Sequence, residues 1–189
     1  MKFDKHIATT ISKANRAIGI ISRSFKCKKK HIMLPLYKSI IRPILDYCSP
    51  VWNPYLKKDI QALEKVQRRF TRMIEGFKEL SYEQRLGKLH LMTLEMRRLR
   101  YDLIVTYKIM HGLEMVKREK FFKINKSNTR GNSMELYKNA VSTTQRKNFY
   151  CERIINAWNV LPDDVVKSKN VAQFKAHLTS ERLGTLTSL

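Results

Sequence analysis

Apolar residues return every three or four positions along the start of the chain. They fall on one face of a helix at Phe3, Ile7, Ile11, Ala14, Ile18, Ile21 and Phe25. This spacing predicts one long amphipathic helix. The helix is predicted to end in the basic run 26–31, because cations suit the negative end of a helix dipole.

A second apolar stripe follows between Met33 and Ile44. It predicts another helix, interrupted at Pro43 because proline lacks an amide hydrogen and clashes with the preceding turn. Two further prolines within 49–54 disfavour continued helix, so this segment is predicted to be a rigid corner.

The third helix is predicted to begin near Lys57 and to carry an apolar stripe that ends at Ile74. Gly76 suits the turn that stops it. Ser81 and Gln84 then stand three residues apart, which is the spacing of a capping box, and predict the start of a short helix.

Beyond this point helical and polar segments alternate. Thr93 is predicted to cap a helix that stops near Gly112. Residues 125–145 are polar and turn-rich, and we interpret them as a linker or an exposed hairpin, with room for a short strand over 134–141. Helical spacing then returns.

The last helix is predicted over 171–178, with Ser168 or Asn170 as its N-cap. The elements together predict a mainly α fold: a helical bundle, then a second small helical region, with room for a short β hairpin. The predicted segments are a helical bundle at 1–78, a helical connector at 79–124, a polar linker or hairpin at 125–145 and a C-terminal helical region at 146–189.

Charge adds a functional indication to this fold. The chain has 38 Lys and Arg against 16 Asp and Glu, a net charge of +22, and residues 1–78 alone hold 18 against 5, a net +13. Such an excess predicts RNA, DNA or an RNA–DNA hybrid as partner, bound through its phosphates. A membrane surface is disfavoured, because the basic residues are spread over several amphipathic segments.

Clusters of basic side chains are the candidate phosphate contacts. The candidates are Lys28, Lys29, Lys30, Lys57, Lys58, Arg68, Arg69, Arg72, Arg97, Arg98 and Arg100. Any single cluster is typical of a solvated helix face, but together with the charge of residues 1–78 they favour a phosphate-binding surface. Trp52 either stacks on bases or fills the core.

The sequence contains no recognisable set of catalytic or metal-binding residues. Cys27 and His31 lack the second pair of ligands that a zinc site needs. Asp163 and Asp164 are the one adjacent pair of carboxylates, and they fit a turn or a helix cap better than a magnesium site. A glycine-rich phosphate loop is also missing. We therefore expect no catalytic residue, metal or cofactor.

The cysteines and the hydropathy of the chain indicate the cellular compartment in which it is expected. Three widely spaced cysteines argue against a disulfide framework. No apolar run approaches the roughly 20 residues that cross a bilayer, and the first residues do not form a signal peptide. We expect an intracellular protein, nuclear or cytoplasmic, that is not secreted and has no membrane partner.

Several blocks of sequence resemble one known family. They are Leu36–Cys48, Val51–Tyr55, Leu63–Ile74, Leu80–Leu86, Leu94–Arg100, Tyr107–Gly112, Thr129–Gly131 and Trp158–Pro162. In order and number these blocks resemble the region downstream of the palm in reverse transcriptases of jockey-like non-LTR (LINE-type) retrotransposons. The resemblance extends from about Phe3 to Leu178.

This resemblance implies that residues 1–78 form a thumb-like bundle that grips a template–primer duplex by its backbone. The polymerase carboxylates of that family lie in the palm, in a Tyr-x-Asp-Asp type motif that this chain lacks. RNA-directed DNA synthesis is therefore not expected of the chain alone, and the missing palm is the expected packing partner of the first helix. The alternatives are a residual enzyme that uses Asp163 and Asp164, and a host-recruited helical DNA-binding or protein-interaction module.

Overall fold

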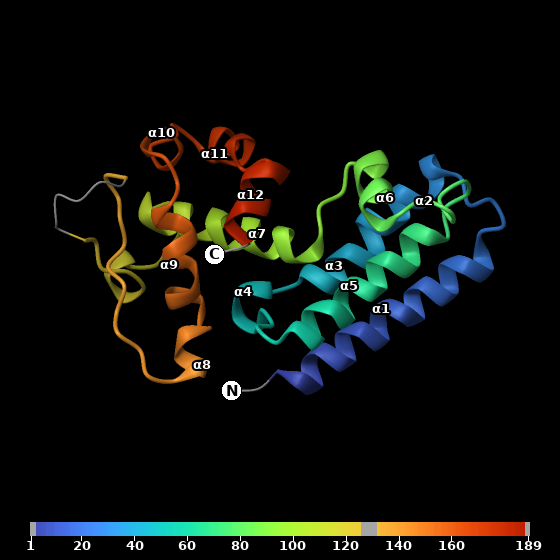
Figure 1. Ribbon diagram of the computed structural model, residues 1–189, viewed down its shortest axis with the longest axis horizontal. Coiled ribbons are helices and arrows are strands. Elements are labelled where there is room, and N and C mark those ends of the chain that lie inside the picture. Colours follow the sequence, from blue (N-terminus) through green and yellow to red (C-terminus); the bar gives the residue numbers. More distant parts are fainter. Residues whose placement is uncertain (1–2, 126–131, 188–189) are drawn as a thin grey trace. The chain divides into compact units, whose positions relative to one another are not determined.

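The computed structural model describes residues 3–125 and 132–187. The chain divides into two compact units, Met1–Glu95 (unit 1) and Met96–Leu189 (unit 2), so the expected connector 79–124 is shared between them. Helices predominate in both units (Figure 1), which confirms the mainly α fold. Among the described residues, β structure is limited to an isolated antiparallel bridge between Ile124 and Leu136.

Unit 1 is built from three helical rods. Its elements are α1 (Asp4–Ser24), α2 (Lys30–Leu36), the π-helical turn η1 (Tyr37–Ile41), α3 (Arg42–Asp46), α4 (Ser49–Trp52), α5 (Lys57–Arg72) and α6 (Tyr82–Leu89). Helices α1 and α5 lie side by side, and the rod formed by α2, η1 and α3 packs against α1 (Figure 1). Near the start of both helices, Asp4 of α1 and Asp59 of α5 line one small cavity. Further along both, Arg69 of α5 donates a hydrogen bond to Asn15 of α1, so α1 and α5 run in the same direction.

The apolar stripe of α1 provides one wall of the core of unit 1. Ile7, Ala14, Ile18 and Ile21 are buried, as the sequence predicts. Phe70 of α5 is fully buried in the same cluster. Complete burial of a large apolar side chain contributes about 1.5–3 kcal/mol, so this stripe holds α1 against its neighbours.

The predicted interruption of the second helix at Pro43 is wrong, because the chain stays helical through this proline. Pro43 cannot donate a backbone hydrogen bond, and its ring would clash with the carbonyl four residues earlier. The chain widens into the π-helical turn η1 just before it, where the amide of Arg42 donates to the carbonyl of Tyr37, five residues back. The wider turn accommodates the proline.

The predicted corner over 49–54 contains one helical turn, α4. Cys48 precedes it in the left-handed conformation, with φ of 54°. The indole of Trp52 is only 3% exposed, and its Nε1 donates to the carbonyl of Tyr47 at 2.7 Å. Of the two roles considered for Trp52, the structure therefore supports filling of the core.

Several helix boundaries agree with their sequence signals. The capping box of Ser81 and Gln84 is formed in full. Gly76 and Gly112 follow their helices with φ of 77° and 66°, a region that glycine enters without strain. The side chain of Asn170 accepts a hydrogen bond from the amide of Gln173 and so is the N-cap of α11.

Unit 2 surrounds a core of aromatic and aliphatic side chains. Its elements are α7 (Leu94–Met110, which begins at the end of unit 1), the 3₁₀ turn η2 (Arg118–Lys120), α8 (Thr144–Lys147), α9 (Tyr150–Asn159), α10 (Asp163–Val166), α11 (Val171–His177) and α12 (Ser180–Thr187). Tyr107 of α7 stacks on Phe174 of α11 with ring centroids 4.3 Å apart. Trp158 of α9 is completely buried beside them.

The segment 125–145 differs from its prediction. The strand expected over 134–141 does not form, because pairing is limited to the bridge at Leu136 and two flanking backbone hydrogen bonds. Leu136 and Asn132 are buried, so this part of the segment is not fully exposed. Residues 126–131, which the prediction also covers, lie outside the described residues.

The C-terminal helix α12 was not predicted. Only two of its residues are buried, Leu183 and Leu186, so its apolar stripe is too short to predict a helix. Gly184 lies so close to Met96 that an added Cβ would meet the methionine methyl at 3.3 Å. Close packing of this kind stabilises a helix that its own sequence pattern does not predict.

Candidate nucleic-acid interface

The last turns of α5 carry three exposed arginines, each held differently. The guanidinium of Arg68 lies over the ring of Tyr82 in α6, 4.7 Å from its centroid. Arg69 Nη1 donates to Asn15 Oδ1 of α1 at 3.0 Å. Arg72 is exposed in the final turn. The structure therefore brings these three predicted residues together at one end of unit 1.

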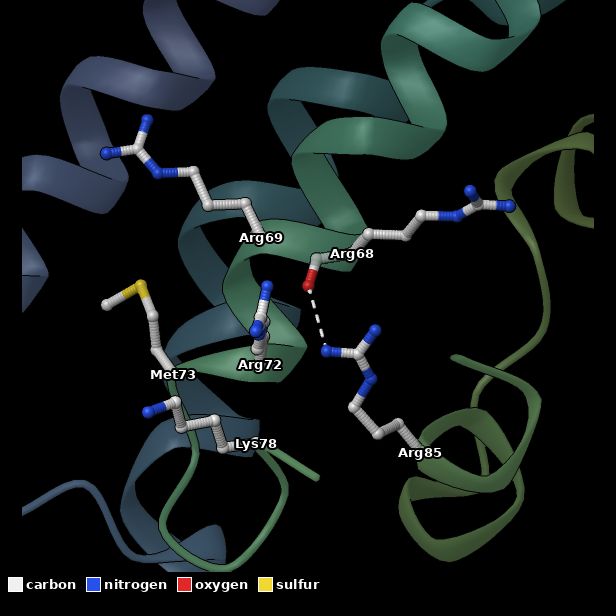
Figure 2. Close-up of a pocket in the computed structure, with 6 residues that line it drawn as sticks. All are labelled: Arg68, Arg69, Arg72, Met73, Lys78 and Arg85. Carbon is white, nitrogen blue, oxygen red and sulfur yellow. Dashed lines mark hydrogen bonds between the residues drawn. The ribbon is translucent and has the colours of Figure 1, made fainter. Parts of the chain in front are cut away.

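These arginines border a groove of about 550 Å³, which we term the arginine groove. It is lined by Arg68, Arg69, Arg72, Met73, Lys78 and Arg85. Figure 2 shows that Arg69 and Arg68 extend toward opposite sides, that Arg72 lies between them, and that Lys78 and Arg85 lie below Arg72 in the view, one on each side. Five of the six lining side chains are cationic, so the groove concentrates positive charge in a concave surface.

Arg85 is the least exposed of these cations, at 7%. Its Nη1 donates to the carbonyl of Arg68 across 3.4 Å (Figure 2), and its guanidinium lies 5.6 Å from the centroid of Tyr82. Tyr82 and Arg85 are three residues apart in α6, which places both on one face of that helix. The ring of Tyr82 thus helps to position two arginines of the groove.

A buried network lies beneath this ring. The hydroxyl of Tyr82 donates to Glu64 Oε1, and Gln67 Nε2 donates to the Tyr82 oxygen at 2.7 Å. The other carboxylate oxygen of Glu64 accepts a hydrogen bond from the amide of Leu94 at 3.0 Å. Burial, and then the charge of Glu64, raise the pKa of Tyr82 well above its usual range. The phenol therefore stays protonated and keeps donating.

The lysine cluster 28–30 lies at the same end of unit 1. The carbonyl of Lys28 accepts a hydrogen bond from the amide of Glu75, just after α5, and Lys30 Nζ donates to the carbonyl of Lys88 in α6 at 2.6 Å. The connection between α1 and α2 therefore meets the end of α5 and α6 (Figure 1). We call this surface the basic end; its cations are Lys28, Lys29, Lys30, Arg68, Arg69, Arg72, Lys78, Arg85 and Lys88.

Acidic residues offset little of this charge. Glu75, Glu79 and Glu83 are exposed at or beside the basic end. The pKa of Glu83 is lowered by backbone and Ser81 hydrogen bonds and, to a smaller extent, by the charges of Arg68 and Arg85. Within the described residues, no carboxylate forms an ion pair with the arginines of the groove. Positive charge therefore exceeds negative charge at this end.

Lys57 and Lys58 lie elsewhere. Both are exposed in the first turn of α5. With a rise of 1.5 Å per residue, that turn is about 20 Å from Arg72 along the helix axis. The structure therefore does not join Lys57 and Lys58 to the basic end.

The three predicted arginines of α7 belong to unit 2 and differ in exposure. Arg98 is only 1% exposed, which corrects the prediction that it contacts phosphate, because a phosphate cannot reach a side chain so deeply buried. Arg100 Nη2 donates to the carbonyl of Lys175 at 3.0 Å, and burial, followed by the charge of Arg97, lowers its pKa. Arg97 is partly exposed.

The residues considered as catalytic or metal-binding candidates do not form a catalytic or metal site among the described residues. Asp163 is in the first turn of α10, where it accepts hydrogen bonds from the amide of Ser133 at 2.7 Å and from Lys167. Bonding to Lys167 and Ser133 lowers its pKa to about 2. Asp163 therefore lies at the start of α10, but the N-cap position is Pro162, so its side chain does not form the helix cap that was one of the two predicted roles. Cys27 and His31 are both exposed, and the described part of the chain contains no group of three or more possible metal ligands.

Sequence reasoning missed Lys78, Arg85 and Lys88 as members of the basic end. Arg85 carried a usable signal, because the capping box at Ser81 fixes the phase of α6 and places Arg85 on the face of Tyr82. Lys78 lies in the connection before α6, where no periodicity indicates direction. Only the fold places it beside Arg72.

No family model matches the chain, and comparisons with curated proteins and with solved structures find no significant match. Within the described residues, none of the helices combines the length and apolar character needed to cross a membrane.

Proposed function

We propose that this chain is a nucleic-acid-binding module that corresponds to the thumb and post-thumb region of a jockey-like non-LTR reverse transcriptase. In this proposal it binds a template–primer duplex through phosphate contacts and has no polymerase activity on its own. The observation that carries the proposal is the convergence of cations from three segments of unit 1 on the basic end. The sequence blocks that resemble this family support it further.

Helix stability alone explains part of the positive charge at the basic end. Arg69 and Arg72 are in the last turn of α5, where cations stabilise any helix through its dipole. That effect does not explain why Lys78 and Arg85, from other segments, line the same groove. Backbone binding explains it, because phosphates are satisfied by clustered cations without a defined base sequence.

The proposal is tested by measuring the affinity of the whole chain for an RNA–DNA hybrid over a series of salt concentrations. Log K is expected to fall linearly with log salt. Replacing Arg68, Arg69 and Arg72 together with Gln should flatten that slope by up to about 2.7, because each phosphate that an arginine neutralises contributes about 0.9 to it. Salt-independent binding of the unchanged chain contradicts the proposal.

A matched control separates the basic end from net charge. Replacing Lys117, Lys120 and Lys123 with Gln removes the same charge from exposed positions of unit 2. Because Arg68 and Arg69 also make contacts within the fold, the double variant Arg72→Gln with Lys78→Gln provides a second test with less effect on folding. Equal decreases of affinity in the control and in the groove variants would show that the groove has no special role.

The two alternatives give different results. Selection from a random duplex library returns one enriched motif if the chain is a sequence-specific regulator, and none if it binds backbone. A primer-extension assay with Mg²⁺ tests for enzymatic activity. Template-dependent incorporation that is abolished when Asp163 and Asp164 are both replaced with Asn would overturn the proposal that the chain is not a polymerase.

A further inference from the structure

Arg85 is a buried cation that still lines the arginine groove. Its side chain is 7% exposed, and Nε has no hydrogen-bond partner among the residues that the structure describes. The bond from Nη1 to the carbonyl of Arg68 is long, at 3.4 Å. A buried charge without a carboxylate partner is costly, so an anion that enters the groove would stabilise Arg85 more than it would an exposed arginine.

Two other cations face the same space. Arg72 approaches from the last turn of α5, and Lys78 approaches from the connection that leads to α6 (Figure 2). Arg68 and Arg69 are drawn to the sides of the groove by Tyr82 and Asn15. The three remaining cations of the lining, Arg72, Lys78 and Arg85, are the set that we call the phosphate seat.

We propose that the phosphate seat binds a phosphate monoester, which under the proposed function is the terminal phosphate of a nucleic-acid strand. A monoester carries nearly two charges at neutral pH and three free oxygens. An internal phosphodiester carries one charge and is flanked by a sugar on each side. The end of a strand can enter a concave groove as far as Arg85, whereas phosphates along the outside of a duplex reach the exposed Arg68 and Arg69.

The chemistry of the ligand predicts a dependence on pH. A phosphate monoester loses its second proton near pH 6, whereas arginine and lysine stay charged. The preference of the seat for a phosphorylated end should therefore increase as the pH rises through about 6 and then level off. Glu83 is the acidic side chain whose charge is felt by Arg68 and Arg85, and it ionises below this range because its pKa is lowered.

The experiment compares two hybrid duplexes that differ in one group, a 5′-phosphate or a 5′-hydroxyl, and measures the affinity of the whole chain for each. The phosphorylated duplex should bind about tenfold more tightly, which is the effect of one added charge-assisted hydrogen bond. Arg85→Gln and Lys78→Gln should each remove most of the difference, and Arg85→Lys should retain part of it. Lys78 is exposed, so its replacement leaves folding intact. Lys57→Gln with Lys58→Gln is the control and should keep the full difference.

A second readout uses inorganic phosphate as the probe. Phosphate should shift the NMR signal of the Arg85 Nε–H downfield, because that group gains a hydrogen bond, and chloride at equal ionic strength should shift it less. Equal affinity for both duplexes together with an unmoved Nε–H signal overturns the seat, even if salt-dependent binding upholds the proposed function. If the chain does not bind either duplex but phosphate still shifts the Nε–H signal, the result supports the phosphate seat and contradicts the proposed function.

Discussion

The hydroxyl of Tyr82 in α6 donates a hydrogen bond to the buried carboxylate of Glu64 in α5. The guanidinium of Arg68 lies 4.7 Å above the same ring, and Arg85 lies near it from α6. One side chain therefore joins the polar network of the interior to the cations of the arginine groove.

Replacing Tyr82 with Phe should lower the free energy of unfolding by about 1–3 kcal/mol, because it removes the hydroxyl that donates to Glu64 and accepts from Gln67 in the buried network. Chemical denaturation measures this change. The folded-state pKa of Tyr82 lies above its ordinary value of 10, so the wild-type chain should lose stability as the pH rises above about 10. A variant that loses stability just as steeply in alkali would show that Tyr82 is not responsible.

Arg98→Gln should lower thermal stability and leave the affinity of the folded chain for a hybrid duplex unchanged. The reason is that Arg98 is 1% exposed and its charge acts in the interior of unit 2, where it partly opposes the burial that raises the pKa of Asp102. Thermal unfolding and duplex titration below the unfolding transition measure the two effects. A decrease of affinity comparable to that of Arg72→Gln would restore Arg98 as a phosphate contact.

Asp102 should make unit 2 less stable at neutral pH than at mildly acidic pH. Its carboxylate bonds to Arg153 at 2.9 Å, yet burial outweighs this attraction and raises its pKa to about 6. The folded state therefore holds the proton more tightly than the unfolded state, and stability from this group falls as the pH rises from about 4 to about 6. The change amounts to at most about 3 kcal/mol.

The measurement is the free energy of unfolding of the wild-type chain and of Asp102→Asn across this range of pH. Asn stays neutral at every pH, as the carboxyl of Asp102 does in the folded state below about pH 6, so the variant should be closest to the wild type in stability near pH 4. Its stability should also change less between pH 4 and pH 6. Parallel curves for the two proteins would exclude Asp102 as the source of the pH dependence.

Asn132→Ala should destabilise unit 2 by about 1–3 kcal/mol. Its buried Nδ2 lies within 3.4 Å of three carbonyl oxygens at the end of α9, those of Trp158, Asn159 and Leu161, and its Oδ1 accepts from the amide of Met134. Truncation leaves these carbonyls without that donor. Hydrogen exchange measured on the amides around Leu136 should speed up more than exchange in α5. Equal effects on both units would mean that Asn132 does not act locally.

Local chemistry explains why parts of the fold could be predicted from the sequence. The stripe of α1, the capping box at Ser81 and the cap at Asn170 each depend on residues within one or two helical turns. The π-helical turn before Pro43 was not predicted, because periodicity does not reveal how a helix accommodates a proline. The prediction of a strand over 134–141 was wrong, because within the described residues no neighbouring strand pairs with this segment along its length.

The candidate site was also only partly predictable from the sequence. A net charge of +22 and the clusters at Lys28–Lys30 and Arg68–Arg72 were evident in the sequence, and they indicate a polyanionic partner because electrostatic attraction depends little on exact geometry. Only the tertiary structure decided which cations converge. It brings Lys78 and Arg85 to Arg72, leaves Lys57 at the far end of α5, and buries Arg98.

The physical reason is the range over which each property is set. Helix formation, capping and net charge depend on composition and on neighbours within a few positions, so the amino-acid sequence by itself determined a basic and mainly helical protein. Exposure and convergence depend on contacts between residues far apart in the chain, such as Lys30 with Lys88 and Asn15 with Arg69. Tertiary packing alone therefore decided that the basic residues at one end of unit 1 form a groove.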